Sequence, residues 1–581
     1  MDNSTKINTS KNPDLVTYKI LSGGEEIPQT YQINSITATN EINRIPTATI
    51  VIFDGNPAEQ NFEKSDEDYL IPGKEIEIRA GYHSDEETIF KGIVIKNSIK
   101  IRSAGSFLTV ECRDKSVKLT VGRKSKVYYN STDSDVFSEI IGKYGLEEEI
   151  EDTAYEHNEL VQFNSSDWDF LVSRAQANGK LCFVENGKIS IKKPDTTQES
   201  VQSVAFGSTI LDFDGEIDAR NQFSKMSTYS WNQGDQEIVE LEAVNPNVAL
   251  NGNLTASDLA SVIGLDNYEL KHGGFLSEEE SQTWADSALL YQQLAKVRGR
   301  VRFIGVPFVK PNTILNLQGV GDRFNGNIYV TGVLHNIAEG SWTIDVQFGF
   351  NPEWFSETYE INACPASGLL PAVNGLQYGV VSQLEEDPEG EDRILVKIPI
   401  VNSTEQGIWC RLALLDAGEN RGSIFRPDLG DEVVIGFINE DPNDAIILGM
   451  LNSSAKPAPF PAEDANNIKG FVTRSEIKFL FDDEAKSITM ETPSGKTISV
   501  NDDDGEIKLE DENSNVITMN SDGISLETPK DINLISKGDL NLEGININIK
   551  ASAQLKTEGT AGAEISSNAN TVVKGSLVQI N

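Results

Sequence analysis

In the stretch Gly430–Leu451, acidic and amide residues lie between two apolar runs at a spacing that could suit a metal or catalytic site. A calcium loop of the EF-hand kind needs oxygen ligands at alternate positions, with a glycine and a distant glutamate after them. Asp441 and Asn443 fit the first two positions, but Ala445 stands at the third and no glycine follows directly. Asp, Asn and Pro are also the residues of tight turns. We therefore predict a hairpin turn here rather than a metal site or a catalytic pair of carboxylates.

A second short motif, Ser494-Gly495-Lys496-Thr497, is similar to the end of a phosphate-binding loop. The first glycine of such a loop would stand at position 490, which is Met490, and no helix pattern follows. The acidic run Asn501–Gly505 lies between two strand patterns and is interpreted as a solvated turn that discourages lateral pairing. Neither motif predicts a binding site.

Histidine and cysteine, which often ligate metals or act as nucleophiles, are few and scattered. The chain contains His83, His157, His272, His335, Cys112, Cys182, Cys364 and Cys410. No G-x-S-x-G accompanies the histidines and no C-x-x-C is present. We predict buried, reduced thiols, and no catalytic, cofactor-binding or metal-binding residue.

The composition excludes several classes of function. The 581 residues carry a net charge of −41, which repels nucleic acid and anionic lipid at long range. With 38% hydrophobic residues, the chain can build cores for several domains. The start has no basic segment followed by an apolar one, so we expect synthesis in the cytoplasm without a signal peptide.

Strands dominate the pattern along most of the chain. Apolar and polar residues alternate in short runs, as in Ile76–Ala80, Phe107–Val110, Arg300–Phe303 and Trp342–Val346. Three helices are predicted, beginning after Thr132, Ser166 and Ser277, the last extending towards Gly299. Their apolar stripes are assigned to core packing: Val136, Ile140, Ile141 and Tyr144; Trp168, Leu171, Val172 and Ala175; Trp284, Ala288, Tyr291 and Ala295.

A compact block at residues 370–452 holds about five short strands, which is typical of a small closed barrel of the oligonucleotide-binding (OB) type. Residues 453–485 follow as a predicted linker, because Pro457, Pro459 and Pro461 interrupt any period.

From about residue 486 the sequence becomes a repeat of paired apolar residues. The pairs are Ile488/Met490, Ile498/Val500, Ile507/Leu509, Ile517/Met519, Ile524/Leu526, Ile532/Leu534, Leu540/Leu542 and Ile547/Ile549. First members step by 10, 9, 10, 7, 8, 8 and 7 residues, so the period tightens towards eight.

Eight residues hold one strand and one turn, which is too little for a single chain to wrap its own core. A one-chain β-helix needs a coil of about twenty residues or more, and three chains with one octad each supply that length. We therefore predict a three-sided needle at residues 486–581, on the order of 50 Å long. Its predicted core comprises Ile524, Leu526, Ile532, Leu534, Leu540, Leu542, Ile547 and Ile549.

Motifs in three parts of the chain carry a family resemblance. Trp168-Asp169-Phe170-Leu171 with Arg174-Ala175 and Gly179 is similar to a hub motif, D-F-L-x-R-L-A-x-x-x-G. Gly299-Arg300-Val301 with Pro311-Asn312-Thr313 is similar to the last hub barrel, with Asn312 where glycine is usual. The stretch from Phe425 to Asn452 is similar to P-x-x-G-x-E-V-x-V-x-F-x-x-G-D-x-x-x-P-x-x-x-G-x-x-x-N, with Asn439-Glu440 at the glycine step and Ala445 at the proline. The chain thus resembles VgrG, the hub–spike family of type VI secretion and contractile injection systems.

The resemblance implies a mainly β architecture: a hub of β-barrel domains with helical insertions at 1–369, an OB-fold neck, and an intertwined trimeric β-helix. It further implies a non-enzymatic homotrimer that docks on a hexameric inner tube, contacts baseplate proteins and pierces a target membrane on firing. A PAAR-like tip cap would contact the C-terminal residues Leu577, Val578, Gln579, Ile580 and Asn581, and effectors could travel as cargo. The particle would carry the chain out of the cell or into a target.

Two other functions remain open on the sequence. A trimeric β-helical tailspike that degrades polysaccharide would use paired carboxylates on the needle surface. A cell-surface adhesin would need a secretion signal. The residues do not distinguish an intracellular machine from a released particle.

Overall fold

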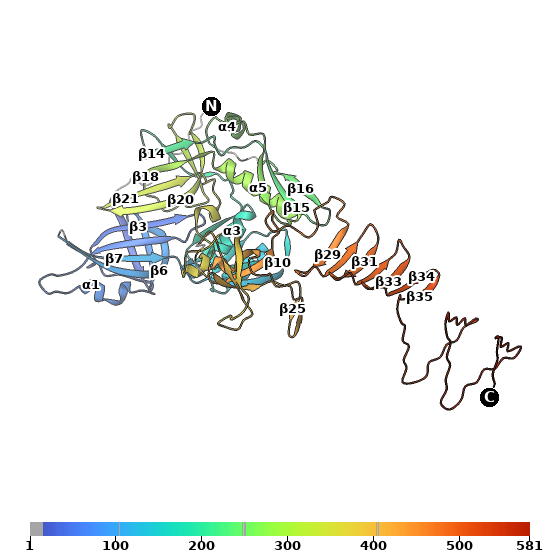
Figure 1. Ribbon diagram of the computed structural model, residues 1–581. Coiled ribbons are helices and arrows are strands. Elements are labelled where there is room, and N and C mark those ends of the chain that lie inside the picture. The colour runs from blue at the N-terminus through green and yellow to red at the C-terminus, as the bar shows by residue number, and fades with distance from the viewer. Residues whose placement is uncertain are drawn as a thin grey trace. The chain divides into compact units, whose positions relative to one another are not determined.

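The computed structural model describes residues 15–580, apart from 104, 247, 249, 250, 402, 403 and 405. The chain forms two compact units, one up to residue 374 and one from residue 375, with residues 439–442 grouped with the first. Both units are mainly β (Figure 1). No helix in the described part is long and apolar enough to cross a membrane.

The described residues of the first unit form twenty-one strands and six α-helices. The strands are β1 (Val16–Ser22), β2 (Glu25–Glu26), β3 (Ile33–Glu41), β4 (Thr47–Phe53), β5 (Glu75–Tyr82), β6 (Asp85–Arg102), β7 (Gly105–Arg113), β8 (Lys124–Thr132), β9 (Glu147–Ile150), β10 (Glu156–Ser165), β11 (Leu181–Glu185), β12 (Lys188–Lys192), β13 (Ser200–Ala205), β14 (Ile210–Ile217), β15 (Met226–Asn232), β16 (Glu237–Glu242), β17 (Tyr268–His272), β18 (Val297–Ile304), β19 (Ile314–Gln318), β20 (Gly326–Ala338) and β21 (Ser341–Phe348). The helices are α1 (Glu63–Asp66), α2 (Asp133–Gly142), α3 (Asp167–Ala177), α4 (Ala256–Ile263), α5 (Glu278–Leu294) and α6 (Phe355–Thr358).

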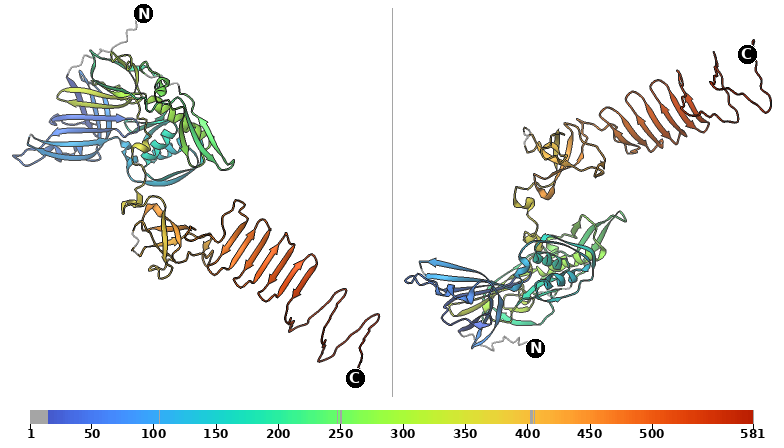
Figure 2. Two further views of the ribbon diagram at one scale, coloured as in Figure 1. Left: turned by 45° about the horizontal axis from the view of Figure 1, so that its top comes forward. Right: turned by 90° about the horizontal axis from the view of Figure 1, so that it is seen from below.

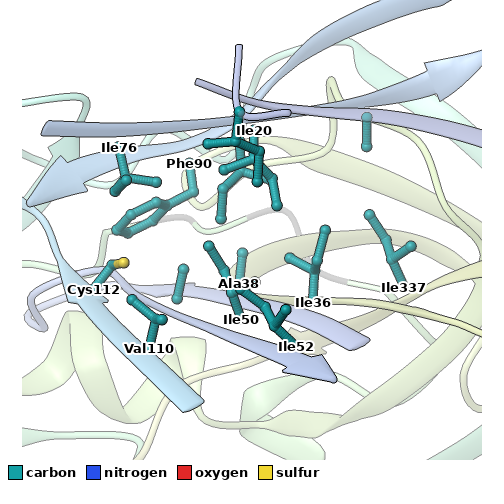
Figure 3. Close-up of a cluster of buried hydrophobic side chains, with 14 of the residues drawn as sticks. Ile20, Ile36, Ala38, Ile50, Ile52, Ile76, Phe90, Val110, Cys112 and Ile337 are labelled. Carbon is teal, nitrogen blue, oxygen red and sulfur yellow. The ribbon is translucent and has the colours of Figure 1, made fainter. Parts of the chain in front are cut away.

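A 13-stranded sheet organises this unit, with the order β14-β18-β21-β20-β3-β4-β7-β6-β5-β1-β2 and with β19 and β13 joined beside β20. Because side chains alternate across a strand, one face of each strand is apolar and buried. The half around β3–β7 has its own core, in which Ile36, Ile50 and Ile52 are fully enclosed (Figure 3). The half around β18–β21 has a second core with Val301, Ile344 and others. The ladder between β3 and β20 joins the halves in one sheet.

Helices α2 and α3 pack with β8, β11 and β12 around a third apolar cluster, whereas α5 contributes buried residues to two smaller clusters. All three predicted helix starts are confirmed: the side chains of Thr132, Ser166 and Ser277 accept hydrogen bonds from the backbone three residues on. The third helix ends at Leu294, before the predicted limit, because Gly299 already belongs to β18. The stripe residues are buried apart from Tyr144 and Trp284, which are half-buried.

The sequence analysis did not identify α4. Its start carries a full capping box, in which Thr255 and Asp258 bond each other's backbone, and its end has Gly264 in the left-handed conformation. Only Leu259 and Ala260 of this helix are buried, so its apolar stripe is too short to stand out. The cysteine prediction is also wrong at one position, since Cys364 is exposed while the other three thiols are buried.

In the second unit, β22 (Gln377–Gln383), β23 (Ile394–Lys397), β24 (Ile408–Leu412), β28 (Ala445–Met450) and β27 (Glu432–Phe437) close into a five-stranded barrel in that order. The predicted small barrel is therefore confirmed. Residues between β27 and β28 form the predicted connection, since Phe437 pairs with Ala445. At the glycine step, Asn439 and Glu440 have φ values of 51° and 59°, a region that glycine adopts without strain.

Seven further strands form an antiparallel sheet in sequence order, seen as successive hairpins in Figures 1 and 2. They are β29 (Ile468–Val472), β30 (Lys478–Asp482), β31 (Ser487–Glu491), β32 (Thr497–Asn501), β33 (Glu506–Glu510), β34 (Val516–Asn520) and β35 (Gly523–Glu527). The sheet thus begins inside 453–485, the segment predicted as a linker. In the described residues 528–580, no further strand is formed.

Candidate functional site: the apolar face of the C-terminal sheet

One face of the C-terminal sheet is a continuous apolar ladder from β30 to β35, and on β29 it continues with Phe471 while Lys469 stands opposite Phe481. Each pair of the sequence repeat stands directly opposite the next pair. The cross-strand partners include Phe481 and Ile488, Ile488 and Val500, Ile498 and Leu509, Leu509 and Ile517, and Met519 and Ile524. Such pairs stabilise a sheet because neighbouring side chains touch side by side. The outward surface of each side chain stays uncovered, so the apolar face needs a second layer.

Within the described residues, no second layer covers this face. Phe479 and Ile517 are half-buried, and most other apolar side chains on the face are exposed, from 37% for Leu509 to 76% for Ile524. Among the described residues, no buried apolar side chain lies beyond Ile447. A sheet is stable when its apolar face packs on another element, and soluble monomers rarely expose apolar patches of this extent. The face is therefore the strongest candidate for an assembly surface.

The predicted needle-core residues divide into two groups. Ile524 and Leu526 lie on β35, the last strand of the ladder. The other six follow the last strand, and their exposed fractions lie between 49% for Ile532 and 66% for Leu534 and Ile549. These six residues have the repeat spacing in the sequence, but the described chain around them forms no strand. Only Ile524 and Leu526 therefore belong to the ladder.

The predicted tip residues lie at the end of the described chain. Leu577, Gln579 and Ile580 are exposed, with values of 82% for Leu577 and 91% for Ile580, and Val578 is also exposed at 48%. Asn581 lies outside the described residues.

The opposite face and the turns of the same sheet are polar. Ser499 and Lys508 stand opposite each other one position away from the apolar pair of Ile498 and Leu509. Turn charges pair in solvent, as in the 3.0 Å contact between Lys486 Nζ and Asp503 Oδ1. Polar turns and an apolar face give the sheet two different surfaces, one for water and one for protein.

The first strand of the sheet is anchored on the barrel of the same unit. The rings of Phe425 and Phe471 stack with centroids 4.9 Å apart at 16°. Arg474 contacts Asp428 at 3.2 Å, and Lys456 Nζ donates to the Gly430 carbonyl and to Asp431 Oδ1. Aromatic stacking adds about 1 kcal/mol to simple burial, so the start of the sheet is held in a fixed direction from the barrel.

In the first unit, charged groups gather in a buried cluster between helices. Asp133 on α2 is 2% exposed and accepts two hydrogen bonds from Arg174 on α3, at 2.7 and 2.8 Å. It also contacts His157 Nε2 at 3.0 Å and Asn178 Nδ2 at 3.0 Å. Burial opposes ionisation, but the guanidinium and the other donors outweigh it and hold the pKa of Asp133 well below its usual range. Since Glu280 on α5 lies 3.4 Å from His157 Nδ1, the cluster ties three helices together.

The sequence analysis singled out Arg174 only as part of a motif. It did not identify Asp133 or His157 as partners, because 41 residues separate Asp133 from Arg174 and no local spacing connects them. The one available signal was an arginine inside an otherwise apolar helix stripe.

Carboxyl groups elsewhere serve as ionised partners. Among the described residues, every carboxyl group with a clearly shifted pKa has a lowered one. Hydrogen bonds from Arg220 lower the pKa of Asp218 to about 2, and hydrogen bonds from Asn515 lower the pKa of Asp511 to about 2. A general acid of a glycosidase needs a raised pKa instead. The described part of the chain also contains no group of three or more His, Cys, Asp or Glu arranged to hold a metal ion.

Two strand edges of the large sheet have a neighbouring strand on one side only in the described residues. β14 ends the sheet, and its Asp212, Asp214 and Glu216 pair with Arg302, Arg300 and Arg298 of β18. At the other side, β6 pairs with β5 only up to Ile93 in the described residues, so from Ile95 to Arg102 it has β7 on one side alone. This second edge carries Lys96, Lys100 and Arg102 and no acid.

Two family models match the chain. The model described as the Alg8 N-terminal domain matches residues 12–339, more than half of the chain. The model described as the type VI secretion system/phage-baseplate injector OB domain matches residues 377–451, which is the closed barrel.

Known proteins with similarity come from the same group of machines. The type VI secretion system spike protein VgrG1a of Pseudomonas aeruginosa is 24% identical over 224 residues, which cover 35% of this chain and 33% of that protein. The chain thus spans about a third of the length of this curated relative. Among solved structures, a tail protein from Neisseria meningitidis has a TM-score of 0.44 at 12% identity and covers 58% of this chain and 98% of that one. A Francisella PdpA–VgrG complex has a TM-score of 0.38 at 10% identity, with 88% and 80% covered.

Proposed function

We propose that this chain, which belongs to the family of the Alg8 N-terminal domain, is a homotrimeric hub–spike related to the VgrG spike proteins of contractile injection systems. In this role the first unit is the hub, the closed barrel is the neck, and the C-terminal repeat is the needle. The protein is structural and performs no catalysis.

The apolar face of the β29–β35 sheet is the observation that carries this proposal. Most of its apolar side chains are 37–76% exposed in one chain, and burial stabilises by about 25 cal/mol for each Å² of apolar surface. Three copies placed side by side turn three such faces towards one axis and enclose them. Three chains with one octad each also supply the coil length that a β-helix needs.

The large sheet supports a ring of three hubs. Each chain contributes two halves with separate cores, so three chains give six similar units, in keeping with a hexameric inner tube. The β14 edge and the Ile95–Arg102 edge are unlike edges of the same sheet, and each has a neighbouring strand on one side only. Head-to-tail pairing of unlike edges closes a ring when the rotation fits.

The exposed residues Leu577–Ile580 form the contact for a PAAR-like tip cap, which could carry effectors as cargo. Baseplate proteins hold the hub, and contraction of the machine supplies the work of piercing the target membrane. The chain is made in the cytoplasm, assembled into the particle, and delivered outside the cell or into a target. The lowered pKa values of its shifted carboxyl groups favour this structural role over the polysaccharide-degrading alternative.

Light scattering on the full-length protein tests the trimer. A mass near three times 63.7 kDa is expected for the full-length protein. A chain that ends at Asn452 lacks the needle and should form the trimer less readily. A well-folded full-length monomer would overturn the proposal.

A further inference from the structure

A small hairpin on the barrel, residues 415–424, is fixed by its own contacts; we refer to it as the arm. Its strands are β25 (Ala417–Gly418) and β26 (Arg421–Gly422). Arg421 Nη1 donates to both carboxylate oxygens of Asp416, at 2.8 and 3.2 Å. The backbone of Ser423 donates to the Asp416 carbonyl at 2.9 Å, and Ser423 Oγ accepts from the Asp416 backbone at 3.1 Å. The arm therefore has a defined shape before it meets any partner.

Two large apolar side chains flank these contacts and point away from the barrel core. Leu415 is 95% exposed and Ile424 is 77% exposed, next to the bonded pair of Asp416 and Ser423. Mobile loops often expose single apolar residues without consequence. Here the exposed residues stand at the base of a hydrogen-bonded hairpin, so their positions are set and little entropy is lost when a surface covers them.

The arm adjoins the apolar face of the needle. Phe425 directly follows Ile424 and stacks on Phe471 of β29. Phe471 stands opposite Phe479, which stands opposite Met490 in the apolar ladder. An apolar surface thus continues from Leu415 and Ile424 through the stacked rings onto the face that the proposed trimer buries.

We propose that the arm packs against the neighbouring copy of the chain and holds the trimer together at the level of the barrel. This inference rests on the proposed trimer and adds a contact outside the needle. Layers that bury a sheet face lie about 10 Å from it. A chain that packs on the first strands of the ladder therefore also contacts the arm beside Phe425. In the proposed trimer this chain is a second copy of the protein.

Site-specific crosslinking in the full-length protein tests the contact. A photoreactive benzoyl-phenylalanine at Leu415 should give a crosslinked species of two chains after illumination, whereas the same group at Glu419, in the polar turn of the arm, should give little. Crosslinks confined to one chain would overturn the arm contact. Light scattering on the same sample separates the two proposals, since a monomer contradicts the trimer and a trimer without crosslinks contradicts only the arm.

Subunit exchange gives a second, independent readout. The double variant Leu415→Ser and Ile424→Ser should speed the mixing of differently labelled trimers about tenfold or more, because each chain loses two apolar contacts. The matched variant Glu419→Ser and Asn420→Ser, in the same arm, should exchange like the unchanged protein. Equal exchange rates for both variants would show that the arm does not contribute to assembly.

Discussion

Two regions of this protein use the same alternation of apolar and polar residues and reach opposite outcomes. On β5 in the first unit, Ile76 and Ile78 are 1% and 0% exposed. On β32 in the C-terminal sheet, Ile498 and Val500 are 47% and 39% exposed. The alternation determines which side chains share a face. It does not determine what covers that face.

Strand regularity explains the difference. Ladders of the large sheet contain register shifts, for instance between β5 and β6, β6 and β7, and β20 and β21. Such bulges bend and twist strands, so the sheet can curl over its own side chains. The described ladders from β29 to β35 contain no register shift. A regular meander with one strand in each step stays open, so its cover has to come from other chains.

The largest expected effect follows from charging the exposed face. Replacing the cross-strand pair Ile498 and Leu509 by Asp should abolish the trimer, because every chain would place two carboxylates inside the needle at a cost of several kcal/mol each. Light scattering on the full-length variant measures the loss.

The matched control charges the other face of the same two strands. Ser499→Asp with Lys508→Asp alters the neighbouring cross-strand pair, whose side chains face water in the trimer. A trimer mass is expected for this variant. Dissociation of both variants, or of neither, would contradict the assignment of the two faces.

The first unit should respond to a single buried charge without any change in assembly. Asp133→Ala leaves Arg174 without its carboxylate and should lower the free energy of unfolding by about 3–5 kcal/mol. Asp135→Ala on the same helix removes only a capping contact and should cost about 1 kcal/mol. Urea denaturation followed by tryptophan fluorescence reports this unit, since Trp409 alone lies outside it. Similar losses for the two variants would show that the buried cluster is not a special source of stability.

Local signals in the sequence predicted local structure well. Ser166 with Asp169 marks a helix start because the hydrogen bond spans three residues, and the alternating runs mark strands. Asn312 is a further local feature. It replaces the glycine that is usual at this position, and its φ of 67° lies in a region that glycine adopts without strain. These features depend on neighbours in the chain.

Features that depend on distant or absent partners were not predictable in this way. The Asp133 cluster joins elements from across the hub. The first two strands of the C-terminal sheet were hidden by the prolines before them, although Phe479 and Phe481 form a pair nine residues before Ile488 and Met490. In the proposed trimer, the apolar face of the needle is covered by the neighbouring chains. The sequence of one chain specifies this face but not the chains that cover it.

Acid should separate the two regions as well. Burial lowers the pKa of His335 to about 4, and Trp342 Nε1 donates to its Nδ1 at 3.3 Å. Between the ordinary pKa of about 6.5 and about 4, the unfolded chain binds a proton that the folded unit excludes, so stability falls as the pH decreases. The full loss is about 3 kcal/mol. Unfolding of the first unit measured at pH 7 and pH 5 should show part of this loss.

The variant His335→Gln isolates this contribution from that of the carboxyl groups. Its unfolding free energy should depend less on pH between 6.5 and 5 than that of the unchanged protein. The C-terminal sheet contains no histidine, so trimer dissociation should not follow this slope. An identical pH dependence in protein and variant would show that protonation of His335 is not linked to folding.

The smallest effect is expected from the ion pairs on the turns of the needle. Lys486 and Asp503 are 65% and 52% exposed and stay in solvent when the apolar face is enclosed. Exposed pairs contribute about 0–1 kcal/mol, since water and salt screen them. Lys486→Ala should therefore leave the dissociation temperature of the trimer nearly unchanged, while Asp133→Ala strongly destabilises the hub. A large effect of Lys486→Ala would mean that the turns meet a neighbouring chain. The charged turns would then belong to the interface, and the needle would be held at its edges as well as through its core.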